Sequence, residues 1–97
     1  MVKITFLDGE ELIIDPDTVI SGYKKIESDN KKEYYLRIVF KDSINGEFST
    51  DGSLINTDNP KIGLAGLLLS VDCFAIGLDD RTSVTYLSSA VKSIENI

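Results

Sequence analysis

The sequence contains no histidine and no tryptophan, and it has one cysteine and only two prolines in 97 residues. Without imidazole, zinc, copper and non-haem iron sites lose their most common ligand, and serine and cysteine hydrolases lose their usual proton shuttle. Glycoside hydrolysis and Mg²⁺ or Ca²⁺ binding need only carboxylates, but these must be paired in a pocket. We therefore expect a protein that is not an enzyme and that holds no metal and no cofactor.

The single cysteine excludes an intramolecular disulfide. Cys73 lies in the apolar run 71–76, and no histidine is available to lower its pKa, so it is predicted to be a small buried hydrophobe. No secretory signal follows Met1, and Asp72 interrupts the most hydrophobic stretch, 62–78. These features favour a cytoplasmic protein that does not enter a membrane.

Positive charge is also scarce: the sequence has ten Lys and Arg and sixteen Asp and Glu, which gives a net charge of −6. An acidic chain repels the phosphates of a nucleic acid, so nucleic-acid binding is not expected. The one basic run, within residues 24–33, is interleaved with Glu27, Asp29 and Glu33 and is predicted to be a solvated loop. A surplus of negative charge favours a partner protein with a basic surface.

What the chain does contain is an ordinary globular balance, with 42% hydrophobic and 27% charged residues, which predicts one compact domain over residues 1–97. Val2, Ile4 and Phe6 alternate with polar residues, Asp8-Gly9 follows, and 10–14 is again β-prone. This pattern predicts a hairpin with a two-residue turn, which would set Ile4 opposite Ile13.

A longer strand is predicted over 33–41, with one apolar face that covers the core. That face carries Tyr34, Leu36, Ile38 and Phe40. Shorter strands are predicted at 19–23, 47–50, 73–78, 82–87 and 91–94. Turns are predicted at 15–17 and 79–81, and Asn45-Gly46 and Asp51-Gly52 are two further candidates. A two-residue turn at Asp51-Gly52 gives the better core match, because Phe48 would face Ile55, whereas at Asn45-Gly46 Ser43 would face Phe48.

Asp58-Asn59-Pro60 is typical of a helix start, and the apolar residues of 61–70 recur at helical spacing. Gly63 and Gly66 weaken a helix, so a buried strand is the alternative for this segment. The predicted fold class is mainly β, or α+β: a small antiparallel β-barrel or sandwich of about seven short strands, with one short helix near 60–70.

Two segments resemble the second half of bacterial Sm-like RNA chaperones, which are small β-barrels. These are Asp72-Cys73-Phe74-Ala75-Ile76-Gly77-Leu78 and Ala90-Val91-Lys92-Ser93-Ile94. The resemblance implies a small barrel that binds RNA and assembles into oligomers. The Lys-His pair with which that family contacts RNA falls on Ser88 and Ser89, so this chain departs from the family at its RNA site.

The leading hypothesis is a non-enzymatic protein-binding module of the kind found among inhibitors, immunity proteins and phage or mobile-element accessory proteins. Its partner surface is expected to border the cation-free stretch 42–60 together with an aromatic and a basic residue on the preceding strand. The candidate partner-binding residues are Tyr35, Arg37, Asp42, Glu47, Asp51 and Asp58. The alternatives are an Sm-like nucleic-acid-binding barrel and a self-associating structural domain that pairs through a strand edge near Ile94.

Overall fold

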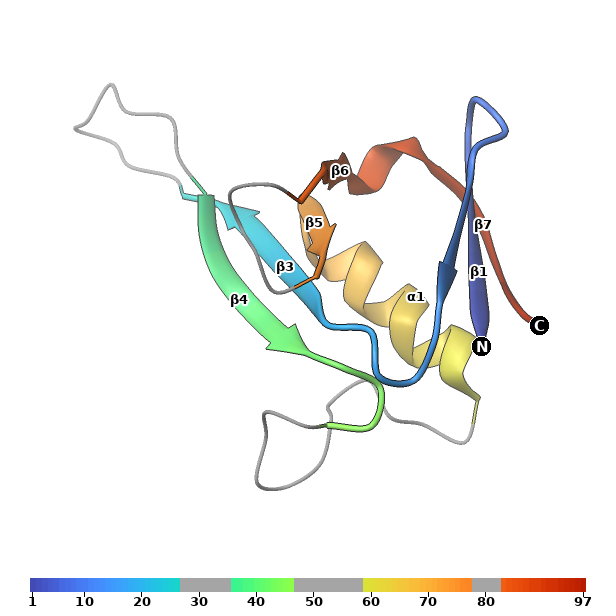
Figure 1. Cartoon of the computed structure of the whole chain (residues 1–97). Helices are drawn as coiled ribbons and strands as arrows, with labels where there is room; N and C mark the ends of the chain where they lie inside the picture. The colour runs from blue at the N-terminus through green and yellow to red at the C-terminus, as the bar shows by residue number, and fades with distance from the viewer. Residues whose placement is uncertain (27–35, 47–58, 78–82) are drawn as a thin grey trace.

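The residues that the structure describes fold into two small antiparallel sheets and one helix (Figure 1). The computed structural model describes residues 1–26, 36–46, 59–77 and 83–97. The elements are β1 (Val2–Phe6), β2 (Glu11–Ile14), β3 (Ile20–Lys25), β4 (Leu36–Asp42), α1 (Pro60–Ser70), β5 (Cys73–Ile76), β6 (Thr85–Leu87), the 3₁₀ turn η1 (Ser88–Ala90) and β7 (Val91–Asn96). One sheet has the order β2-β1-β7 and the other β4-β3-β5-β6, which confirms the predicted mainly-β class.

The two sheets share one core with the helix. Phe6 from the first sheet stacks on Tyr86 from the second with ring centroids 5.0 Å apart, and Phe74 lies 5.4 Å from Tyr86. Leu64 and Leu68 of α1 are buried in the same cluster. Aromatic pairs of this kind add to the free energy gained from burying their apolar area. The three rings therefore join the sheets at the end of the core near η1.

The β1–β2 hairpin forms, but the predicted register is wrong by one residue. Ile4 pairs with Leu12, and the Phe6 and Glu10 backbones are hydrogen-bonded (2.8 Å), so the loop has three residues. Gly9 closes it at φ +91°, the left-handed conformation that three-residue hairpin loops require. Because side chains alternate along a strand, this shift places Ile14 inside and leaves Ile13 exposed.

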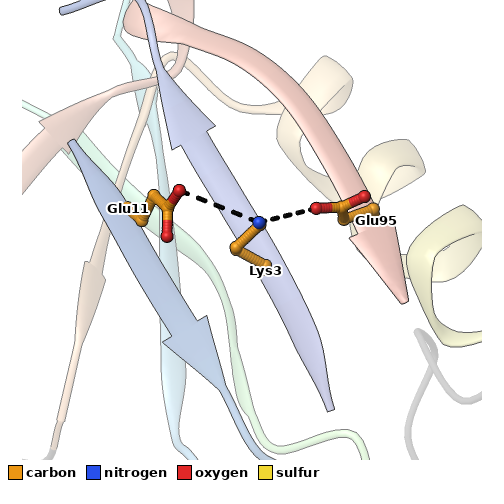
Figure 2. Close-up of polar contacts among 3 residues, drawn as sticks. All are labelled: Lys3, Glu11 and Glu95. Carbon is orange, nitrogen blue, oxygen red and sulfur yellow. Dashed lines mark ion pairs between the residues drawn. The ribbon is translucent and has the colours of Figure 1, made fainter. Parts of the chain in front are cut away.

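One lysine connects all three strands of the first sheet (Figure 2). Lys3 Nζ of β1 lies 2.7 Å from Glu95 Oε1 of β7 and 3.7 Å from Glu11 Oε1 of β2. The hydrogen bond to Glu95, followed by the charge of Glu11, raises the pKa of Lys3, and the same hydrogen bond lowers the pKa of Glu95. The shorter contact to Glu95 is therefore the dominant one.

Two predicted turns are confirmed, and they are bonded to each other. At 15–18, Asp15 Oδ1 accepts the Asp17 N–H and Asp15 C=O accepts the Thr18 N–H, which are local bonds typical of an Asp turn. At the second turn Gly46 has φ +76°, and Asn45 Nδ2 donates to Asp17 Oδ1 (2.7 Å). The acidic pair Asp15 and Asp17 thus has a structural role in the turn.

Strand β4 is not the core-covering strand that its alternation predicts. Leu36 and Ile38 are each 45% exposed, Val39 is exposed as well, and only Phe40 packs against the core. A bulge shifts the register, so that Phe40 pairs with Gly22 but Ile38 pairs with Tyr23. The reason is tertiary: among the described residues, β4 lies at an edge of its sheet and nothing covers the apolar side chains of its first half.

The segment 60–70 is a helix, as predicted, and the buried-strand alternative is wrong. Pro60 occupies its first turn after Asn59, whose Oδ1 accepts a bond from Asn96 Nδ2 instead of capping the helix. The Lys61 N–H donates to Asn96 Oδ1 (3.1 Å), so β7 satisfies a backbone donor at the start of α1. Within the part of the chain that is described, no helix has the length and hydrophobicity to cross a membrane.

Several predictions lie outside the described residues. These are the strand at 47–50, the Asp51-Gly52 turn with its Phe48–Ile55 pair, the turn at 79–81, and the placement of Tyr34. The strands predicted at 19–23, 73–78, 82–87 and 91–94 form, with ends that differ from the predicted ones by at most three residues.

Candidate functional site

An open hollow of about 550 Å³ lies between helix α1 and the β3–β4 hairpin strands. We call it the α1–β4 groove. Its strand side consists of Lys24, Arg37, Val39 and Phe40, and its helix side of Ile62, Gly63, Gly66, Leu67, Ser70 and Val71. The lining is mainly apolar, as is usual for sites that bind other molecules.

Glycines at two places shape this groove. A Cβ at Gly22 of β3 would lie 3.0 Å from Val71 Cγ1 and 3.5 Å from Leu67 Cδ1, so glycine lets the end of α1 approach the sheet closely. A Cβ at Gly66 would meet nothing within 4 Å, because that face of the helix looks into the groove. Gly22 therefore lets the lining residues Leu67 and Val71 lie close to β3, and the missing side chain of Gly66 leaves open space on the helix side of the groove.

The charged residues of the groove are both cations, and they face each other. Lys24 of β3 and Arg37 of β4 are directly paired in the strand register. Neither forms an ion pair with any described residue, and no acidic side chain lines the groove within the described ranges. Like charges in directly opposite positions of an antiparallel pair destabilise it, so these two cations have no structural benefit from their proximity.

Exposed apolar side chains lie both in the groove and on the other face of β4. In the groove, Val39 of β4 is 43% exposed and Ile62 of α1 is 57% exposed. Leu36 and Ile38 are exposed too, but they alternate with Arg37 and so lie on the other face of β4. Within the described ranges β4 pairs only with β3, so the backbone groups of its outer edge have no strand partner there. An exposed edge beside apolar side chains is a surface that readily pairs with another chain.

A second, smaller hollow of about 340 Å³ lies on another side of α1, against β7. Its charged residues are again two lysines, Lys61 and Lys92, and Leu68, Leu69 and Ile94 contribute to its apolar lining. The Oγ of Ser88 in this hollow is buried and has no hydrogen-bond partner among the described residues. Both hollows beside α1 thus present apolar surface with cations, and no described acidic residue lines either of them.

The predicted partner residues are only partly placed. Arg37 lies in the groove, whereas Asp42 is only 4% exposed and its Oδ1 accepts the Ser43 N–H (2.7 Å). A buried, hydrogen-bonded carboxylate cannot present its charge to a partner, so Asp42 is not part of the candidate site. Tyr35, Glu47, Asp51 and Asp58 lie outside the described residues.

Sequence reasoning misses the helix side of the groove. In the sequence, Gly63 and Gly66 are considered only because glycine lowers the stability of a helix. Ile62 and Leu67 are considered only as apolar residues at helical spacing. A sequence signal exists, since α1 is apolar on nearly all sides, with Leu69 89% exposed. The apolar face of a short helix with so little polar surface is too wide to be covered by a single core.

Cys73 is buried, as predicted, and burial raises the pKa of its thiol, with a further increase from the charge of Asp72. Among the described residues no three acidic, cysteine or histidine side chains gather in a way that could hold a metal ion.

Comparisons of the chain with protein-family models, with curated proteins and with solved structures gave no match. The two segments that resemble Sm-like proteins fall in different sheets, the first in β5 and the second at η1 and β7. Ser88 and Ser89, which occupy the places of that family's RNA-contacting pair, lie in η1.

Proposed function

We propose that this protein is a non-enzymatic binding module that acts by docking a partner protein on the α1–β4 groove and the adjoining edge of β4. The observation that supports the proposal is the groove itself, an apolar hollow in which the side chains of Val39 and Ile62 are exposed. Exposed apolar patches that border an open hollow are typical of protein interaction sites.

The residues around the groove suit contact better than chemistry. Its polar side chains are Lys24, Arg37 and Ser70, and the Ser70 hydroxyl donates to Gly66 C=O (2.8 Å) within the helix. These residues supply no general base with a nucleophile beside it. The unpaired, buried Cys73 suits a reducing compartment, so the proposal includes a cytoplasmic location.

The test is affinity capture from the native cells with three forms of the full chain: wild type, Gly66→Leu and Ser89→Leu. Leucine at position 66 enters the groove, whereas the exposed Ser89 lines neither hollow and controls for an added apolar side chain. We expect one protein to be retained in stoichiometric amount by the wild type and by Ser89→Leu, and to be lost with Gly66→Leu.

Circular dichroism of the three forms provides the folding control, because glycine-to-leucine in a helix is favourable and the variant remains folded. Equal capture by all three forms would contradict the proposal. Nuclease-sensitive retention of RNA by the wild type would instead favour the Sm-like alternative.

A further inference from the structure

We infer that the segment docked in the α1–β4 groove is acidic and amphipathic, with apolar side chains against Ile62 and Leu67 and carboxylates placed at Lys24 and Arg37. This inference rests on the proposed function and specifies the chemistry of the partner. The net charge of −6 by itself favours a basic partner, so the charge inferred here for the docked segment is the opposite of the one expected from the sequence.

The paired cations carry the argument. Lys24 and Arg37 are opposite one another across two hydrogen-bonded strands, and no described acid is paired with either. Within the part of the chain that is described, nothing offsets the repulsion between these like charges, and an anionic group bound between the two side chains would convert it into attraction. Removing such a repulsion on binding adds to affinity without any change of fold.

The distance over which charges interact determines whether the two groove cations or the net charge of the protein has the larger effect on a bound segment. At physiological salt, charges further apart than about 8 Å are largely screened from one another. A carboxylate seated between Lys24 and Arg37 meets two cations and no acidic residue of the described lining. One described acid adjoins the groove, Asp72, and its Oδ2 accepts the Lys25 N–H (2.7 Å). Described acids further from the groove than this screening length act mainly on the approach of the partner and little on the bound complex.

The lining favours a peptide over a nucleic acid. Val39, Ile62 and Leu67 offer aliphatic contacts, and Phe40 is the one aromatic side chain among the described residues of the groove. Single-stranded nucleic acids are held by several aromatic platforms along a continuous cationic track. Two cations beside an aliphatic surface match the apolar and acidic faces of an amphipathic segment instead.

The experiment selects the ligand from random sequences, so it does not require the partner to be identified. A phage-displayed random peptide library is selected on the full wild-type chain and counter-selected on Gly66→Leu. Peptides that depend on an open groove are expected to combine aliphatic residues with an excess of Asp and Glu. If no peptide depends on the open groove, the proposed function fails; if groove-dependent peptides are neutral or basic, only the present inference fails.

Charge variants then test the contacts with a synthetic selected peptide by fluorescence anisotropy. The double variant Lys24→Glu/Arg37→Glu is expected to weaken binding roughly tenfold or more, and Lys24→Gln/Arg37→Gln by a smaller factor. The control Lys25→Glu/Lys92→Glu changes the net charge equally at exposed positions outside the groove, and should retain binding to within about threefold.

Equal losses in the two Glu pairs would overturn the inference, because the effect would then follow net charge and not the groove. Stronger binding of a single-stranded RNA of similar length than of any selected peptide would also overturn it. Retention of binding in the Gln pair at wild-type strength would show that the cations make no contact.

Discussion

At the scale of single residues, glycine has opposite effects at Gly22 of β3 and at Gly66 on the helix side of the groove. Gly22 lies where β3 meets Val71, and Gly66 lies where α1 faces open space. The same residue type is therefore required by packing at the first position and is only a cost to the helix at the second. Sequence alone does not separate the two cases, because both glycines stand in segments with apolar neighbours.

Substitution of each glycine by alanine should shift stability in opposite directions. Gly22→Ala forces Val71 to move and is expected to lower the free energy of unfolding by about 1–3 kcal/mol. Gly66→Ala meets no neighbour and should raise it by up to about 1 kcal/mol. Urea unfolding followed by circular dichroism measures both, and a stabilised Gly22→Ala would contradict the close approach of Val71 to β3.

Cys73 offers a second test at this scale. It is 3% exposed, and burial followed by the charge of Asp72 raises the pKa of its thiol, so the folded protein holds little thiolate at neutral pH. We expect a disulfide exchange reagent such as DTNB to label the native protein far more slowly than the protein unfolded in guanidinium chloride. Labelling at the same rate in both states would show that the thiol is accessible.

At the scale of elements, the strands follow local sequence, but their register and exposure follow from the contacts between them. Asp8-Gly9 predicts the β1–β2 hairpin, yet the loop takes three residues because this register sets Leu12 and Ile14 beside Val2 and Ile4 on the inner face. The alternation of β4 predicts a strand, yet its edge position leaves Leu36 and Ile38 exposed. The spacing of apolar residues and the residues at turns identify a strand or helix in the sequence. The elements that pack against it determine which of its side chains are buried.

The ion pair across β1 and β7 allows a test by titration. The hydrogen bond from Lys3, followed by the Lys3 charge, lowers the pKa of Glu95, and NMR of the carboxyl carbons should show that pKa returning to its ordinary range in Lys3→Met. Since a lowered pKa means that the native state binds protons less readily, the pairing stabilises above the ordinary glutamate pKa and is lost as pH falls through the lowered one.

At alkaline pH the stabilisation from the same ion pair depends on the pKa of Lys3. The pKa of Lys3 is raised, so the stabilisation from pairing is present below the ordinary lysine pKa and is lost as pH rises through the raised one. A Glu95 pKa that does not change in Lys3→Met would contradict the contact shown in Figure 2.

At the scale of the whole molecule, charge is distributed unevenly among the described elements. Five acids occupy the first hairpin and the turn after it: Asp8, Glu10, Glu11, Asp15 and Asp17. The strands β3 and β4 carry four cations, Lys24, Lys25, Arg37 and Lys41, and their one acid, Asp42, is buried. The net charge therefore describes the molecule poorly at the surface where docking is proposed.

The salt dependence of the affinity for the docked acidic segment should reflect this distribution of charge. Because only two cations contact the acidic segment, its affinity is expected to fall by about tenfold or less between roughly 50 and 500 mM NaCl. Binding through six or more phosphates would lose roughly a thousandfold or more over a smaller range. Anisotropy titrations across this salt range distinguish the two, and the steeper dependence would contradict docking through the groove.

The sequence by itself determined the mainly-β class, the short helix after Asn59-Pro60, the turns at 15–17 and 45–46, and the buried state of Cys73. These features depend on turn residues, local periodicity and the flanking apolar residues, which neighbouring positions reveal. Only the tertiary structure decided which strand lies at an edge, that Asp42 is buried, and that Lys24 and Arg37 meet beside the open face of Gly66. Those outcomes depend on contacts between segments far apart in the chain, where register and packing, not local preference, set the free energy.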